Sequence, residues 1–91
     1  MKKARAHLTI EGIVQGVYFR SNTSGLARKN NCSGWVKNTR GGSVEAVIEG
    51  AEVDVKKVVE WCRKGPPMSR VDRVQVRWEE YKGEFDDFEV I

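Results

Sequence analysis

The chain has 91 residues, which favours one domain, residues 1–91, around a single core. Its 16 basic and 13 acidic residues leave a formal charge of +3, which suits anionic ligands weakly and falls short of a nucleic-acid-binding signature. No stretch has the length of a membrane span, and the first residues lack the apolar segment of a signal peptide. We therefore expect a cytoplasmic protein in which Cys32 and Cys62 are free thiols and no metal is bound.

The first part of the chain predicts a strand and then a helix. Apolar and polar residues alternate over residues 4–10, a period of two that indicates a half-buried strand, and Gly12 ends this run. His7 falls on the polar side, so we expect a surface residue and not a catalytic base. Residues 21–31 begin with Ser, Asn and Thr, which are typical of helix starts. Asn31 can end this helix, because asparagine tolerates the left-handed cap conformation.

The rest of the chain predicts a hairpin, a second helix and two further strands. Residues 33–50 contain two β-rich runs joined by a Gly-rich turn, residues 40–42. Residues 51–65 have valines and Cys62 at helical spacing, with acids near the start and bases near the end. Strand patterns follow at residues 69–81 and 87–91.

The predicted order β-α-β-β-α-β defines the fold class. It is typical of an α+β, ferredoxin-like βαββαβ sandwich, in which an antiparallel sheet carries two helices on one face. This fold serves many functions, so the function has to be argued from a site.

The segment GIVQGVYFR, residues 12–20, lies between the first strand and the first helix. Glycine permits positive φ, so successive backbone N–H groups can turn toward one point, and the following helix start offers more unpaired N–H groups. Arg20 ends the segment, and a guanidinium can bind two phosphate oxygens at once. Three apolar side chains would anchor the loop to the core: Val14, Val17 and Phe19. The spacing alone fits a phosphate site and a plain turn with a surface arginine about equally well.

Two stretches of the sequence resemble the signatures of the acylphosphatase family. GIVQGVYFR is similar to the first signature, and GWVKNTRGGSVEAVIEG, residues 34–50, resembles the second along its whole length. The segments GPPMSRVDRVQV and DFEVI are also similar to that family. The resemblance therefore covers nearly the whole chain in the expected order.

The resemblance implies a metal-independent hydrolase that splits acyl phosphates into a carboxylate and inorganic phosphate. It implies two catalytic side chains: Arg20 would bind the phosphoryl group, and Asn38 would orient the attacking water. It also implies a phosphate-binding loop made of five backbone N–H groups, those of Gln15, Gly16, Val17, Tyr18 and Phe19. No cofactor is implied. We expect a monomer that acts on a small-molecule substrate, without a membrane or nucleic-acid partner.

Two other functions fit parts of the sequence. RNA-recognition domains share the element order, but they stack bases on paired aromatic residues in the central strands, and this chain lacks that aromatic motif. A regulatory domain of the same fold without catalytic activity is the second alternative. The presence of both Arg20 and Asn38 argues against it.

Overall fold

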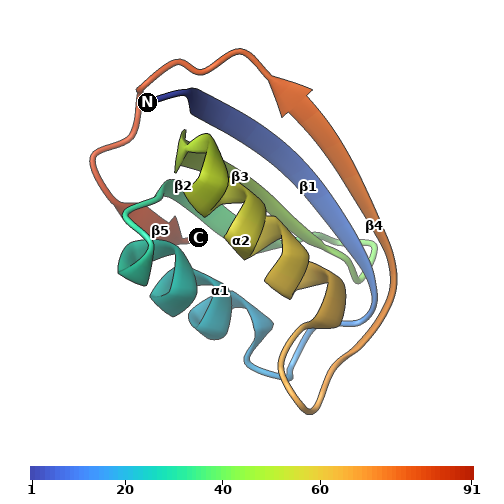
Figure 1. Cartoon of the computed structure of the whole chain (residues 1–91). Coiled ribbons are helices and arrows are strands. Elements are labelled where there is room, and N and C mark those ends of the chain that lie inside the picture. Colours follow the sequence, from blue (N-terminus) through green and yellow to red (C-terminus); the bar gives the residue numbers. More distant parts are fainter.

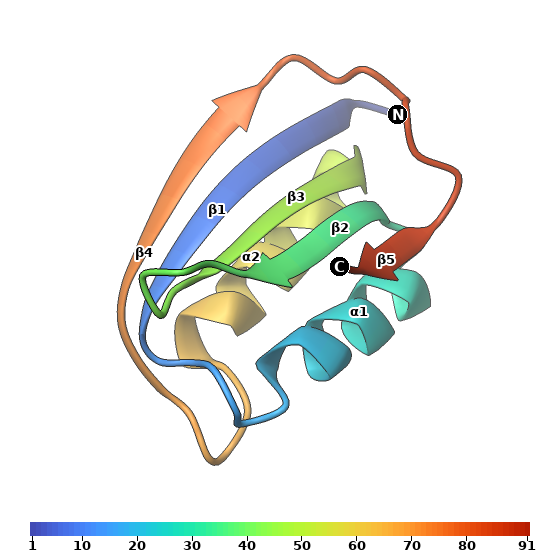
Figure 2. The ribbon, with the colours of Figure 1, turned by 180° about the vertical axis from the view of Figure 1, so that it is seen from behind.

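The computed structural model describes all 91 residues, as two helices packed against one face of a five-stranded sheet (Figure 1). Seen from behind, the other face of the sheet carries no helix, and we call it the open face (Figure 2). The elements are β1 (Lys3–Ile13), α1 (Phe19–Lys29), β2 (Ser33–Asn38), β3 (Val44–Ala51), α2 (Glu52–Lys64), β4 (Arg70–Glu79) and β5 (Phe88–Val90).

The ferredoxin-like α+β fold is confirmed, with one correction to the sheet. The strand order is β4-β1-β3-β2-β5, and the first four strands pair antiparallel as predicted. β5 instead pairs parallel with β2, with Phe88 opposite Gly34, so the sheet is mixed and not purely antiparallel. The reason is the direction of the chain. β4 and β2 run in opposite directions, so a segment that turns back after β4 and reaches the far edge runs parallel to β2.

The core lies between the sheet and the two helices and follows the predicted alternation. Leu8 and Ile10 of β1 are fully buried, as are Val55 and Val58 of α2. Burying one such side chain contributes about 1.5–3 kcal/mol. Because the valines of α2 recur at helical spacing, one face of this helix supplies a continuous part of the core.

Both cysteines are free, as predicted, and both are buried. Burial raises the pKa of the Cys32 thiol to about 11 and the pKa of the Cys62 thiol to about 12. A thiol reacts mainly as its thiolate, so neither group is a competent nucleophile at neutral pH. Their contribution is to packing.

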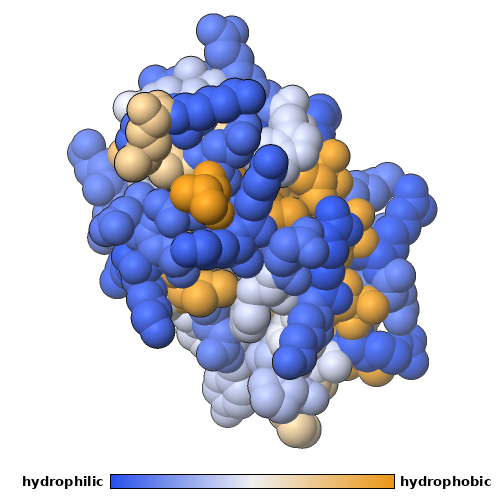
Figure 3. All heavy atoms as spheres, viewed as in Figure 1, coloured by the Kyte–Doolittle hydropathy of each residue, from blue (hydrophilic) through white to orange (hydrophobic).

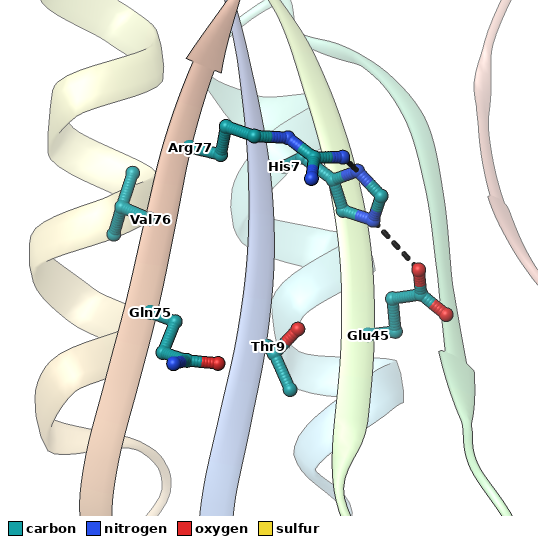
Figure 4. A pocket seen from close by; sticks show the side chains of 6 residues that line it. All are labelled: His7, Thr9, Glu45, Gln75, Val76 and Arg77. Atoms are coloured by element: carbon teal, nitrogen blue, oxygen red, sulfur yellow. Dashed lines mark hydrogen bonds and ion pairs between the residues drawn. The ribbon is translucent and has the colours of Figure 1, made fainter.

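The open face of the sheet is polar. His7 is half-buried there, and its Nε2 lies 2.6 Å from Glu45 Oε2 while its Nδ1 lies 2.9 Å from Arg77 Nη2 (Figure 4). These three side chains line a hollow of about 420 Å³ together with Thr9, Gln75 and Val76. Glu45 of β3 and Arg77 of β4 each bond the imidazole of His7 in β1, so His7 links three strands.

One buried cation ties the open face to the segment that follows β4. Arg5 is 8% exposed and bonds three carboxylates: Glu49 at 3.2 Å, Glu79 at 3.0 Å and Glu84 at 2.6 Å. The backbone N–H of Lys82 also donates to Glu49 at 2.8 Å. These bonds hold the connecting segment against the sheet on its way to β5.

The surface on the helix side is mostly hydrophilic, and apolar side chains are visible there only in separate patches (Figure 3). Neither helix has the length and apolar character required to traverse a bilayer.

The carboxyl group of Glu79 makes stability depend on pH. Hydrogen bonds from Arg5 and then Arg77 lower the pKa of Glu79 to about 2, from a usual value of 4.5. A carboxyl whose pKa is lower in the folded state stabilises that state above its unfolded pKa. The contribution should therefore be lost as the pH falls from about 5 to about 2. Urea unfolding at a series of pH values should show that Glu79→Gln lowers the free energy of unfolding near pH 7 and that the difference from wild type shrinks toward pH 2.

The matched control is Glu80→Gln, because Glu80 is exposed and follows Glu79 directly. Its curve should run parallel to that of the wild type. A constant difference between Glu79→Gln and wild type over the whole pH range would contradict the proposed coupling.

Candidate active site

The loop between β1 and α1 follows an irregular end of β1. The pairing of β1 with β4 shifts between Glu11 and Gly12, where β4 has one extra residue, and then continues to Ile13. At Gly16 φ is 74°, and a Cβ there would touch nothing within 4 Å, so glycine is favoured by the backbone angle and not by lack of space. Val14 and Phe19 are each 1% exposed and Val17 packs against the core. The predicted anchoring of the loop is confirmed.

The N–H groups of this loop have no acceptor within the protein. None of the backbone hydrogen bonds outside the helices and strands is donated by residues 15–19. Phe19 begins α1, so its N–H also has no intrahelical partner. The first turn of α1 contains no acidic residue that would oppose an anion. A run of free donors therefore precedes the positive end of a helix dipole.

The helix begins two residues earlier than predicted, with Tyr18 as its N-cap at φ 64°. Ser21 and Asn22, which the sequence suggested as entry residues, bond back to the Tyr18 carbonyl oxygen from inside the first turn. The Asn22 side chain donates at 2.8 Å and its backbone N–H at 3.2 Å. In a trans peptide the C=O and the next N–H point in opposite directions, so these bonds aim the Phe19 N–H out of the helix end.

A pocket of about 380 Å³ brings the two predicted catalytic side chains together. Arg20 in α1 and Asn38 at the end of β2 both line it. Six further residues complete the lining: Val14, Gly16, Tyr18, Phe19, Ser21 and Val90. Of the predicted site residues, Gln15 and Val17 do not line it. The slightly larger hollow on the open face contains none of them.

Neighbouring elements hold the Arg20 side chain and the backbone of Asn38. Arg20 Nη1 donates to the carbonyl oxygen of Ile91 at 3.3 Å, and the Ile91 N–H donates to Val36 of β2 at 2.9 Å. Asn38 is paired with Val44 across the hairpin. Its Oδ1 is buried and has no hydrogen-bond partner. A buried acceptor without a partner is costly unless a ligand or water satisfies it.

The hairpin turn after Asn38 is connected directly to the loop. The Gln15 side-chain nitrogen donates to the carbonyl oxygens of Thr39 at 2.8 Å and Ser43 at 2.9 Å. The sequence predicted a role only for the backbone of Gln15, and no sequence pattern indicated this side-chain contact. Val90 was missed as well, because its place depends on the parallel pairing of β5.

Comparisons with known proteins identify the family. The family model for acylphosphatases matches residues 6–90. The chain belongs to the acylphosphatase family. An acylphosphatase from Pyrobaculum arsenaticum is 55% identical over 92 residues, with 100% of this chain and 97% of that protein covered. At this identity and coverage the chain is assigned as an acylphosphatase, a hydrolase.

Solved acylphosphatase structures share the fold. The enzyme from Coxiella burnetii superposes with a TM-score of 0.92 at 34% identity, covering 98% of this chain and 93% of that one. The enzyme from Bacillus subtilis gives the same TM-score at 32% identity, covering 97% and 98%. Nowhere in the chain do three His, Cys, Asp or Glu residues gather in a way that could hold a metal ion.

Proposed function

We propose that this acylphosphatase cleaves the carboxyl-phosphate bond in the pocket between the β1–α1 loop and the end of β2. Arg20 and the N–H groups of residues 15–19 bind the phosphoryl group, and Asn38 holds the attacking water. The observation that carries the proposal is that Asn38 and Arg20 line the same pocket. A water held by the Asn38 amide there would lie beside a site suited to an oxyanion.

The phosphoryl-binding role follows from charge. Phosphoryl transfer requires stabilisation of charge on the equatorial oxygens and in-line positioning, with little covalent chemistry from the protein. A guanidinium and preorganised N–H groups supply that stabilisation. The bond from Arg20 to Ile91 holds the guanidinium at the pocket before substrate arrives.

The reaction needs few further groups. Water attacks phosphorus, the phosphorus–oxygen bond to the acyl group breaks, and the electron pair leaves with the carboxylate. A carboxylate is a weak base, so its departure does not require a general acid. The Asn38 side chain has an amide with both donor and acceptor capacity, which can hold the water in line. We propose that the proton of the water passes to the phosphate itself.

The remaining features of the function are also proposals. We propose that residues 1–91 act as one domain and as a cytoplasmic monomer, on a small acyl phosphate and with inorganic phosphate as product. We propose that no membrane or nucleic acid takes part. The volume of the pocket, about 380 Å³, supports a small-molecule substrate.

Replacing Arg20 tests phosphate binding. Arg20→Ala should nearly abolish hydrolysis of benzoyl phosphate and weaken inhibition by inorganic phosphate, because both depend on the same guanidinium. Turnover is followed by loss of the acyl phosphate over a range of phosphate concentrations. Arg73→Ala, which removes an exposed arginine of β4, is the control and should change neither quantity. Unchanged phosphate inhibition in Arg20→Ala would remove Arg20 from the site.

Replacing Asn38 tests the positioning of water. Asn38→Ala should lower kcat about 100- to 1000-fold, equivalent to roughly 2.7–4 kcal/mol if the loss resembles removal of an oxyanion-type contact. Inhibition by phosphate should change little, because phosphate binding is assigned to other groups. The melting temperature should stay near that of the wild type, since Oδ1 has no partner to lose. A near-normal kcat would exclude the role proposed for Asn38.

A further inference from the structure

Gln15 belongs to the β1–α1 loop by its backbone and contacts the β2–β3 turn by its side chain. Its Nε2 donates at 2.8 Å to the Thr39 carbonyl oxygen and at 2.9 Å to the Ser43 carbonyl oxygen. An amide NH₂ has two hydrogens, and both are used here. The reverse amide orientation would place an oxygen against two carbonyl oxygens, so the donor assignment follows from chemistry.

The turn that Gln15 contacts is a closed unit. The Thr39 N–H donates to the Ser43 carbonyl oxygen at 2.9 Å, and the two hydroxyl oxygens lie 2.6 Å apart. Gln15 therefore bonds both ends of a turn whose ends already bond each other. Displacing Gln15 would release the whole turn from the loop.

Asn38 depends on this connection. It immediately precedes Thr39, and its Oδ1 has no partner of its own to fix the side chain. The position of Asn38 relative to the loop is therefore set by the backbone of β2 and by the contacts that hold the β2–β3 turn. The Gln15 side chain bridges the loop and this turn with two hydrogen bonds.

We propose that Gln15 is a positioning residue that sets the distance between the phosphate-binding loop and Asn38. This inference rests on the proposed function, because it assigns the attacking water to Asn38 and the phosphate to the loop. The Gln15 side chain does not line the pocket. It acts through the turn. A displacement of about 1 Å between reacting groups can cost about 100-fold in rate.

A double-mutant cycle with Gln15→Met and Asn38→Ala tests this proposal. Methionine keeps the length of the side chain and removes both donors. Gln15→Met alone should lower kcat by about 10- to 100-fold. In the Asn38→Ala background the same change should lower kcat less than about threefold, because there is no longer an amide to position. Benzoyl phosphate hydrolysis gives kcat for all four proteins, and inhibition by phosphate reports on the loop.

The possible results separate this proposal from the one on which it rests. A near-normal kcat in Asn38→Ala would overturn the water-positioning role and this inference with it. A slow Asn38→Ala with a normal Gln15→Met would overturn this inference alone. If Gln15→Met lowers kcat by the same factor in the wild-type and Asn38→Ala backgrounds, the inference is also overturned, because Gln15 would then act independently of Asn38.

A second variant keeps the test decisive if Gln15→Met folds poorly. In Gln15→Glu the ionised carboxylate faces two carbonyl oxygens, whereas the protonated carboxyl can donate one hydrogen bond. The ratio of its kcat to that of the wild type should rise as the pH falls from about 7 to about 4, through the usual glutamate pKa of about 4.3. A ratio that does not change with pH would overturn the inference. Gln75→Met, the same change at an exposed position on the open face, is the matched control and should leave kcat unchanged.

Discussion

The structure depends on a loop that keeps its N–H groups unpaired and still adopts one conformation. Backbone donors normally find acceptors in helices and strands, so a run of free donors needs other contacts to hold it. Val14 and Phe19 are buried on either side of the loop, and donors from Ser21 and Asn22 fix the Tyr18 carbonyl between them. These buried side chains and the bonded Tyr18 carbonyl group hold the loop in one conformation. Its N–H groups remain available to an anion.

The fold brings this loop to a residue far away in the sequence. Asn38 ends β2, which is separated from β1 by β3 in the sheet. The β1–α1 loop follows the end of β1 at Ile13 and meets the hairpin turn through Gln15. β5 completes the arrangement, because it lies beside β2 and its following residue receives the hydrogen bond from Arg20. β3 and β5 carry none of the proposed catalytic groups, but they help to determine where Arg20 and Asn38 lie.

Much of this could be predicted from the sequence because local patterns determine it. Alternation over residues 4–10 and helical spacing in α2 depend on short-range periodicity, and both predictions are confirmed. The positive φ of Asn31, 57°, follows from the tolerance of asparagine for that conformation and was also predicted. The pairing of Arg20 with Asn38 at one pocket was inferred from resemblance to a family, since spacing alone did not separate a phosphate site from a plain turn.

The features that were missed depend on contacts between distant parts of the chain. The parallel pairing of β5 depends on which edge of the sheet is free. The three residues of β5 have no sequence pattern that indicates that edge. α1 starts early because the side chains of Ser21 and Asn22 donate hydrogen bonds to the Tyr18 carbonyl oxygen. Serine and asparagine can stand before a helix or in its first turn, so their residue types do not predict this start. The contacts of the Gln15 side chain span 24 and 28 residues and have no local signal.

Binding of the phosphoryl group by the backbone of residues 15–19 can be followed by an NMR titration. Inorganic phosphate is added to the ¹⁵N-labelled protein, and the backbone amide shifts are recorded at each concentration. We expect the amides of residues 15–19 to move most and to saturate together with the Arg20 side-chain resonance. Amides of this loop that stay in place, while those around His7 and Arg77 on the open face move, would contradict it.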